Sequence, residues 1–175
     1  MDPITGETRR FEDQRFDFEK AISVIVYNEL YVFKASKSDP VKVYKYKGFT
    51  RAETLVKTTL SNLPHDQALR FFSTCNLANK SIVLTGGYDS RDKATAKTQL
   101  IDIIKQEWQS LPDLNVKRGF HSSCTSVAGH IFVTSGKDSQ IGVYLNSVEM
   151  LRPGEQAWSL IDVPDFKHRG LPIFH

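Results

Sequence analysis

The sequence predicts an all-β protein assembled from repeated four-stranded units. Short runs of β-branched and aromatic residues, such as 81–85 and 130–134, show a period of two residues and end beside glycine or serine. In addition, residues 71–90 align with residues 120–139 without a gap. Self-similarity at a fixed spacing is typical of repeat architectures, so we expect several such units side by side.

The repeat has an offset of 49 residues. The best-matched positions are Phe71 with Phe120, Ser73 with Ser122, Cys75 with Cys124, Thr85 with Thr134, Gly87 with Gly136, and Asp89-Ser90 with Asp138-Ser139. Further along, Trp108 is matched by Trp158 and Leu111-Pro112 by Val163-Pro164, with slips of one or more residues that belong in loops. Chance rarely aligns so many identical positions in a window of this length.

The first unit is expected in residues 19–66, with strands at 21–27, 30–34, 41–46 and 54–60. A turn at Asn28-Glu29 separates the first two strands, and Leu63-Pro64 lies 48 residues before Leu111-Pro112. The unit lacks both a glycine pair and a tryptophan, so it is a degenerate copy. Terminal repeats are often atypical in this way.

The second unit is expected in residues 67–116 and the third in residues 117–166. The second has strand patterns at 81–85 and 99–104, and Trp108 falls on its fourth strand. The third has strands at 121–127, 131–135, 146–151 and 157–163, with a turn at Pro153-Gly154. Residues 1–18 are expected to be an N-terminal extension or linker. Residues 167–175 repeat the Arg-Gly step of 118–119 and are expected to begin a further unit or to form a C-terminal stub.

These features resemble the kelch repeat. The resemblance rests on the strand end Leu84-Thr85-Gly86-Gly87, on Trp108 with Leu111-Pro112 after it, and on Arg118 and His121 before the next strand. It implies that each unit is one four-stranded antiparallel blade of a β-propeller. The third copy departs from the pattern, because Ser135-Gly136 replaces the double glycine, and the tyrosine expected before the tryptophan is not obvious.

The resemblance predicts a partial kelch-type propeller that is incomplete on its own. Propellers close with about four to eight blades, and three blades leave strand edges unpaired. Either the chain is part of a longer kelch protein, or a partner completes it. That partner is a second copy of the chain or another kelch chain in an assembly.

The double glycine Gly86-Gly87 has two interpretations, a phosphate-binding loop or a tight exit from a strand. A phosphate loop opens a helix and has a characteristic Gly-Lys-Ser/Thr or G-x-G-x-x-G spacing. Neither spacing is present, and no amphipathic helix pattern follows. We therefore expect the glycines to allow close packing where a Cβ atom would collide.

Composition restricts the class of protein and its partners. A net charge of +3, with basic and acidic residues interleaved, does not favour nucleic-acid binding. No window approaches the ~18 apolar residues of a membrane span, and the N-terminus lacks the apolar core of a signal peptide. With two cysteines, the expectation is an intracellular, cytoplasmic protein with reduced thiols, and a cytoskeletal or organellar assembly stays open.

The sequence shows no motif for catalysis, a metal or a cofactor. The five histidines have no ligand spacing, and His121 is expected to be a structural hydrogen-bonding residue. Cys75 and Cys124 share a repeat position on neighbouring blades and are expected to be buried and unbridged. Trp108 and Trp158 are expected to anchor blade packing on the fourth strands. We therefore expect a protein that is not an enzyme.

Protein binding is the favoured function, as an interaction module or a structural subunit of an assembly. The loops 88–97 and 137–143 and the connections 113–119 and 165–170 are expected on one face of the propeller. The candidate partner-binding residues on them are Tyr88, Arg91, Asp92, Lys93, Lys117, Arg118, Lys137, Asp138, His168 and Arg169. The set is mostly basic, which would favour an acidic protein surface. A structural role is the alternative for Arg118 and Arg169, which share a repeat position.

Two alternatives follow from the resemblance. Some kelch propellers are enzymes, such as copper oxidases that resemble galactose oxidase and certain sugar isomerases, so the chain is alternatively a fragment of an enzyme acting on a sugar or small molecule. Others are the substrate-recognition part of ubiquitin-ligase adaptors. The companion dimerisation domain of those adaptors is absent from this sequence.

Overall fold

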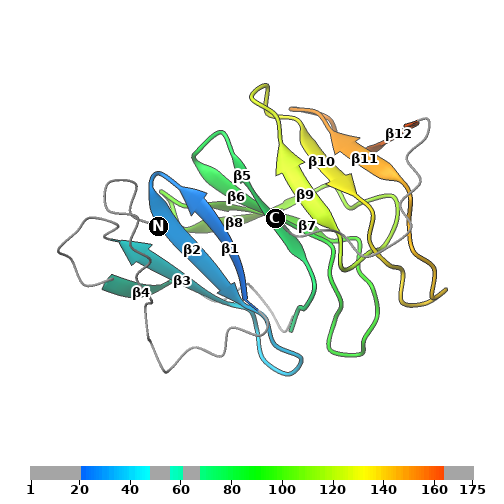
Figure 1. Ribbon diagram of the computed structural model, residues 1–175. Coiled ribbons are helices and arrows are strands. Elements are labelled where there is room, and N and C mark those ends of the chain that lie inside the picture. Colours follow the sequence, from blue (N-terminus) through cyan, green and yellow to red (C-terminus); the bar gives the residue numbers. More distant parts are fainter. Residues whose placement is uncertain (1–20, 48–55, 61–67, 164–175) are drawn as a thin grey trace, which may run out of the picture.

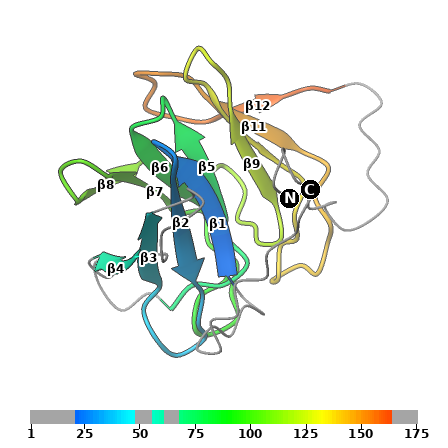
Figure 2. The same ribbon diagram turned by 60° about the vertical axis from the view of Figure 1, so that its left-hand side comes forward.

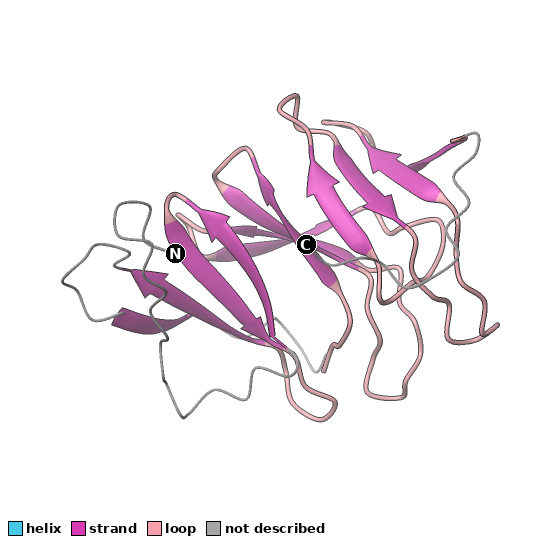
Figure 3. Ribbon diagram, viewed as in Figure 1, coloured by secondary structure: helices cyan, strands magenta, loops and turns pink. Residues whose placement is uncertain are grey.

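A computed structural model of the chain describes residues 21–47, 56–60 and 68–163. These residues form strands, turns and loops and no helix (Figure 3). Three four-stranded antiparallel sheets follow one another along the chain (Figure 1). The first contains β1 (Ala21–Val26), β2 (Glu29–Lys34), β3 (Lys42–Lys47) and β4 (Val56–Leu60); the second β5 (Ser73–Leu77), β6 (Ser81–Thr85), β7 (Thr98–Asp102) and β8 (Glu107–Leu111); the third β9 (Ser122–Thr125), β10 (Ile131–Thr134), β11 (Val148–Leu151) and β12 (Ser159–Ile161).

Within each sheet the strands lie in chain order, so every sheet is a simple up-and-down meander. The sheets stand side by side and face one another, as the two views show (Figures 1 and 2). The first strands of neighbouring sheets adjoin: β1 contacts β5, and β5 contacts β9. Hydrogen bonds join these strands, including Asn76 Nδ2 to the carbonyl of Ile25 at 2.8 Å and Ser123 Oγ to Ser73 Oγ at 2.8 Å. The first strands therefore lie on the inner side of the arrangement.

Two apolar cores fill the spaces between the sheets. The core between the first and second sheets contains Tyr31, Phe33, Val43, Ile82 and Leu84, with Trp108 packed against it. The core between the second and third contains residues from both sheets, listed here as Cys75, Val83, Leu114, Ile131, Val133, Leu151 and Trp158. Successive residues of β6 thus point to opposite cores, because side chains alternate along a strand. A middle sheet covered on both faces explains the continuous apolar run 82–84.

The expectation of an all-β partial propeller of four-stranded antiparallel units is confirmed. The degenerate first copy forms a complete four-stranded sheet, although it lacks the tryptophan and the glycine pair. Several strands are shorter than expected, since β9 and β11 each span four residues. Trp108 lies on the fourth strand of its sheet, and Trp158 precedes β12 by one residue and donates from Nε1 to the carbonyl of Pro112 at 2.8 Å.

The cysteine prediction needs one correction. Both thiols are free, and Cys75 is buried, whereas Cys124 is exposed. Burial raises the pKa of the Cys75 thiol to about 12. The two residues share a repeat position, but the third sheet covers Cys75, while Cys124 sits on the face of the third sheet that points away from the second. Repeat position alone does not determine burial at the end of an array.

The glycine pair ends β6 in the left-handed backbone region, with φ of +56° at Gly86 and +106° at Gly87. A Cβ atom on Gly86 would lie 2.4 Å from the carbonyl oxygen of Arg118, and one on Gly87 would lie 2.9 Å from that of Arg70. The N–H of Gly86 donates to the carbonyl of Lys97 and that of Gly87 to Arg118. The glycines therefore serve close packing and their N–H groups are already used, as the sequence indicated.

Candidate functional site

The candidate site is the loop face, which we define as residues 35–41, 86–97, 112–121 and 136–147. It joins the second to the third strand in each sheet and connects the second sheet to the third, at the lower end in Figure 1. Backbone hydrogen bonds tie these loops together: the N–H of Gly87 donates to Arg118 O at 2.7 Å, and Gly119 and Lys137 exchange two bonds of 3.1 and 2.8 Å. The expected arrangement of these loops on one face is thus present for the described residues.

Most of the predicted binding residues that the structure describes reach the surface of the loop face. Arg91, Asp92, Lys93 and Lys117 are exposed, and Lys137 and Asp138 are half-buried. His168 and Arg169 lie outside the described residues. Arg91, Asp92 and Lys93 lie in one loop, and Lys117, Lys137 and Asp138 come from other loops, so the fold brings charges together that are far apart in sequence.

Several of these charges are already paired. Asp92 binds Lys37 at 2.6 Å and also contacts Arg70, so one carboxylate bridges the 35–41 and 86–97 loops. Arg91 pairs with Asp89 at 3.3 Å. Lys97 pairs with Asp113 at 3.0 Å. Within the described part of the chain, Lys93, Lys117 and Lys137 have no carboxylate partner, and Lys137 Nζ lies 5.4 Å from the ring centroid of Tyr144. These three ammonium groups are the cations that the loop face offers to a partner.

Two predicted binding residues are buried instead, and the prediction is corrected for both. Tyr88 is 8% exposed, and its hydroxyl donates to the carbonyl of Lys137 at 3.3 Å. Burial, followed by the nearby charge of Asp138, raises the pKa of Tyr88. Arg118 is fully buried. Neither side chain is placed to contact a partner, and both hold the loops in position.

Arg118 is the centre of a buried polar network that links the connector 112–121 to the third sheet. Its guanidinium donates to the carbonyl of Ser135 at 2.8 Å, to Ser147 Oγ at 2.9 Å and to Glu149 Oε1 at 2.6 Å. Glu149 is also fully buried and accepts the N–H groups of Asn115 at 2.6 Å and Val116 at 3.1 Å. Burial lowers the pKa of Arg118, and the ion pair with Glu149 opposes this.

Glu149 was missed at the sequence level, although a signal was present. It stands in the middle of the apolar run Val148–Leu151. A carboxylate in such a run is buried only with a partner, and the buried arginine supplies it. By strand register, the second sheet has Gln99 at this position, and the repeat offset places Leu69 where the third copy has Arg118. The ion pair therefore belongs to this copy of the repeat and not to both.

His121 has the structural role that the sequence predicted. Its Nε2 lies 2.8 Å from Thr85 Oγ1, which joins the second sheet to the start of the third. The ring is 1% exposed, and Nδ1 has no hydrogen-bond partner among the described residues. Burial, and then the charge of Arg118, lowers the pKa of His121 to about 3. The imidazole is therefore neutral at physiological pH.

An aromatic cluster lies where the loop face meets the inner strands. The rings of Phe71 and Phe120 stack with centroids 3.9 Å apart, and Tyr88 meets both edge-on at 5.9 and 5.5 Å. Both phenylalanines have left-handed backbones, with φ of +55° and +54°. Such a conformation is uncommon outside glycine and persists only where packing enforces it. The sequence matched the two residues as repeat positions but did not indicate that they touch.

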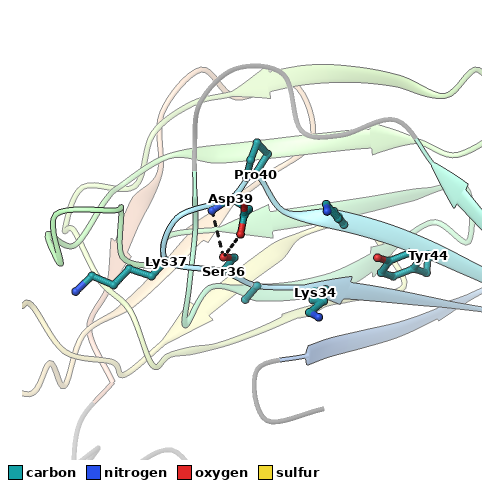
Figure 4. A pocket seen from close by; sticks show the side chains of 8 residues that line it. Lys34, Ser36, Lys37, Asp39, Pro40 and Tyr44 are labelled. Atoms are coloured by element: carbon teal, nitrogen blue, oxygen red, sulfur yellow. Dashed lines mark hydrogen bonds between the residues drawn. The ribbon is translucent and has the colours of Figure 1, made fainter. Parts of the chain in front are cut away.

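Two open cavities indent this end of the molecule. One, of about 420 Å³, is lined by residues that include Asp89, Arg91 and Lys97. The other, of about 320 Å³, lies between the end of β2 and the start of β3 and is lined by residues that include Lys34, Lys42 and Tyr44 (Figure 4). Among the described residues, no group of three or more His, Cys, Asp or Glu side chains is placed to hold a metal ion. The same part of the chain contains no helix long and apolar enough to span a membrane.

Comparisons with known proteins agree with this geometry. The chain is 27% identical over 115 residues to the F-box/kelch-repeat protein SKIP20 of Arabidopsis thaliana, covering 61% of this chain and 27% of that protein. In structure it matches one described as "Structure of YjhT" with a TM-score of 0.67 and 13% identity, covering 83% of this chain and 51% of the other. The fold of the described residues is that of a partial kelch-type β-propeller. Its three sheets are the blades of that propeller.

A second similarity involves an enzyme. The chain is 36% identical over 81 residues to a galactose oxidase of Gibberella zeae, covering 46% of this chain and 11% of the enzyme. The chain thus spans about a tenth to about a quarter of the length of the curated relatives it matches. No protein-family profile matches it.

Proposed function

We propose that this chain is a non-enzymatic kelch-type interaction module whose loop face binds an acidic protein surface. The observation that carries the proposal is the set of three ammonium groups, on Lys93, Lys117 and Lys137, that have no carboxylate partner within the described residues. They come from three different loops held together by backbone hydrogen bonds. Loops on a rigid scaffold are the usual place for recognition.

The charge pattern of the loop face supports an acidic partner. Among the described residues of the loop face, three lysines and the two aspartates Asp39 and Asp138 form no ion pair, so the uncompensated charge is slightly positive. Complementary charge across an interface raises the association rate and fixes orientation more than it raises affinity. Binding is therefore expected to weaken as salt rises, because exposed charges are screened over about 8 Å at physiological ionic strength.

The open ends of the array support a partner as well. Three blades do not close a ring, and each end blade has a sheet face without a neighbouring sheet among the described residues. Closure by another kelch chain, by a second copy or by further blades of a longer protein is part of the proposal. An F-box/kelch-repeat relative favours the more specific role of substrate recognition in a ubiquitin-ligase adaptor.

Cross-linking mass spectrometry of the native complex tests the proposal. A lysine-reactive reagent reports on both ends of the molecule, because Lys80 and Lys105 lie in the turns at the end opposite the loop face. We expect cross-links to an acidic partner from Lys93, Lys117 and Lys137, and none from Lys80 or Lys105. Cross-links concentrated on Lys80 and Lys105 would show that another surface binds.

The second candidate function is part of a kelch-type enzyme acting on a sugar, and the similarity to galactose oxidase favours it. Saturation-transfer NMR with D-galactose separates the two candidates. The interaction-module proposal predicts no saturable transfer to the full chain. Saturable transfer that is lost on changing Phe120→Ala, in the aromatic cluster beside the inner strands, would favour the enzyme candidate instead.

A further inference from the structure

The 320 Å³ cavity of blade one carries an unusual arrangement of charge. Lys34 and Lys42 are directly opposite each other in the β2–β3 register, so their side chains leave the same face of the sheet. Phe33 and Val43, one residue further along each strand, point into the core shared with the second blade. The alternation of side chains therefore places both lysines on the face that points away from the second blade.

Like charges directly opposite each other in a sheet are destabilising. Among the described residues, no carboxylate forms an ion pair with Lys34 or Lys42. Other lysines of this region are compensated: Lys45 pairs with Glu29 at 2.5 Å on the other face of the same blade, and Lys37 pairs with Asp92. Of these four lysines, the two without a carboxylate partner both line the cavity.

The acid that lines the cavity does not neutralise the lysines. Asp39 Oδ2 accepts the hydroxyl groups of Ser36 and Ser38, both at 3.1 Å. In Figure 4 the carboxylate of Asp39 points toward Ser36, and the side chains of Lys34 and Tyr44 lie apart from that carboxylate. The serine Oγ also accepts the backbone N–H of Asp39 at 3.1 Å, which fixes the loop. The lysine side of the cavity is therefore left for an outside anion.

The neighbouring 420 Å³ cavity provides a contrast. Its cations are Arg91 and Lys97, and both already have carboxylate partners, Asp89 and Asp113. An incoming anion there would have to displace a carboxylate. At Lys34 and Lys42 an anion displaces only water and removes a repulsion, so this cavity is the stronger anion site.

We propose that Lys34 and Lys42 receive the carboxylate of an aspartate or glutamate from a protein segment that packs over this cavity of blade one. This inference rests on the proposed function and adds a second, separate contact to the loop face. A cavity of about 320 Å³ is at the small end of ligand pockets, which fits one side chain. Two ammonium groups can each donate a charge-assisted hydrogen bond to the two oxygens of one carboxylate.

The test uses the full chain with its lysines reductively methylated with ¹³C, which keeps their charge, and NMR titration with hexaglutamate. We expect the resonances of Lys34 and Lys42 to shift saturably. Because hydrogen bonds to charged groups contribute about 1.5–3 kcal/mol, the variant Lys34→Gln/Lys42→Gln should bind at least about tenfold more weakly. The matched variant Lys80→Gln/Lys105→Gln, at the end opposite the loop face, should bind this peptide within about twofold of the wild type.

Four results would overturn the inference. The first two are the absence of a saturable shift at Lys34 and Lys42 with millimolar hexaglutamate, and shifts confined to the loop face. The other two are equal losses of peptide affinity in the two variants, and competition by inorganic phosphate at concentrations below those of the peptide. The last would show a site for free anions. Circular dichroism of both variants establishes that they fold. Failure here leaves the cross-linking pattern of the loop face unaffected, so the two proposals fail separately.

Discussion

Removing Glu149 should destabilise the third blade strongly, because the carboxylate satisfies three donors in a site without water access. It accepts from the Arg118 guanidinium at 2.6 Å and from the backbone N–H groups of Asn115 and Val116. Breaking a buried ion pair by deleting one partner costs about 3–5 kcal/mol, since the other charge stays buried and unpaired. Glu149→Ala is therefore expected to lower the free energy of unfolding by at least about 3 kcal/mol.

The double variant Arg118→Leu/Glu149→Gln provides the matched comparison. It places in the third blade the side chains that the second blade has at these positions, Leu69 and Gln99. Replacing a buried pair by groups that need no counter-charge is often close to neutral. The double variant should therefore be more stable than Glu149→Ala, by about 1 kcal/mol or more, and more stable than Arg118→Leu alone.

Equilibrium unfolding in urea, followed by circular dichroism and by tryptophan fluorescence, measures these differences. Trp158 reports on the same region, because it bonds the connector that Glu149 holds. A free energy of unfolding for Glu149→Ala within about 1 kcal/mol of the wild-type value would contradict this prediction. A double variant that is less stable than both single variants would contradict it as well.

Three further predictions concern the packing of the blades. The pKa of His121 is lowered to about 3, against about 6.5 in an unfolded chain, so only the unfolded state takes up a proton as pH falls below 6.5. The free energy of unfolding should then fall by up to about 1.4 kcal/mol for each unit by which the pH falls. In urea titrations between pH 6.5 and 5, His121→Phe should show a shallower dependence of this free energy on pH. An unchanged dependence contradicts the prediction. Thermal melts should show a clearly larger loss of stability for Gly87→Ala than for Gly142→Ala. Both glycines have positive φ, but only Gly87 has a backbone atom within 3 Å of the added Cβ. Equal losses of stability would refute the packing argument. Asp92→Asn should cost less than about 1 kcal/mol, since the Asp92 carboxylate and its partner Lys37 are both exposed, although its second partner Arg70 is mostly buried. A larger loss in the same melts would show that the bridge between the 35–41 and 86–97 loops is structural.

The repeat made much of the fold predictable. An ungapped offset and a period of two residues identified the four-stranded units, and the missing helix pattern after Gly86-Gly87 excluded a phosphate loop. The φ angles and contacts of the two glycines follow from the same argument. These features are local or periodic, which is why a single sequence reveals them.

The candidate site was harder to predict because burial depends on neighbours that are distant in sequence. Tyr88 and Arg118 lie in polar loops, yet one packs against Phe71 and Phe120 and the other pairs with Glu149. An arginine in a loop gives no sign of its orientation until its partner acid is located in another strand. The burial of a charged group is therefore a tertiary property.

At the end of the array the error in predicted burial has the opposite sign, since a residue expected to be buried is exposed. Cys124 was expected to be buried like Cys75, but a sheet face is covered only where another blade follows. The 320 Å³ cavity of blade one could not be predicted from the sequence either, because Lys34 and Lys42 become neighbours only through the β2–β3 register. Loop length and strand register, which determine such pairs, are weakly encoded in a single sequence.

The proposed function requires a protein partner held by the loop face. Native mass spectrometry of the protein isolated gently from its own cells tests this for the wild type and for Lys93→Glu/Lys117→Glu, with Lys80→Glu/Lys105→Glu as the control at the opposite end. We expect a stoichiometric complex with an acidic protein for the wild type and the control, and loss of that protein from the loop-face variant while circular dichroism shows an intact fold. A chain that travels alone, or a complex that both variants retain equally, would contradict it.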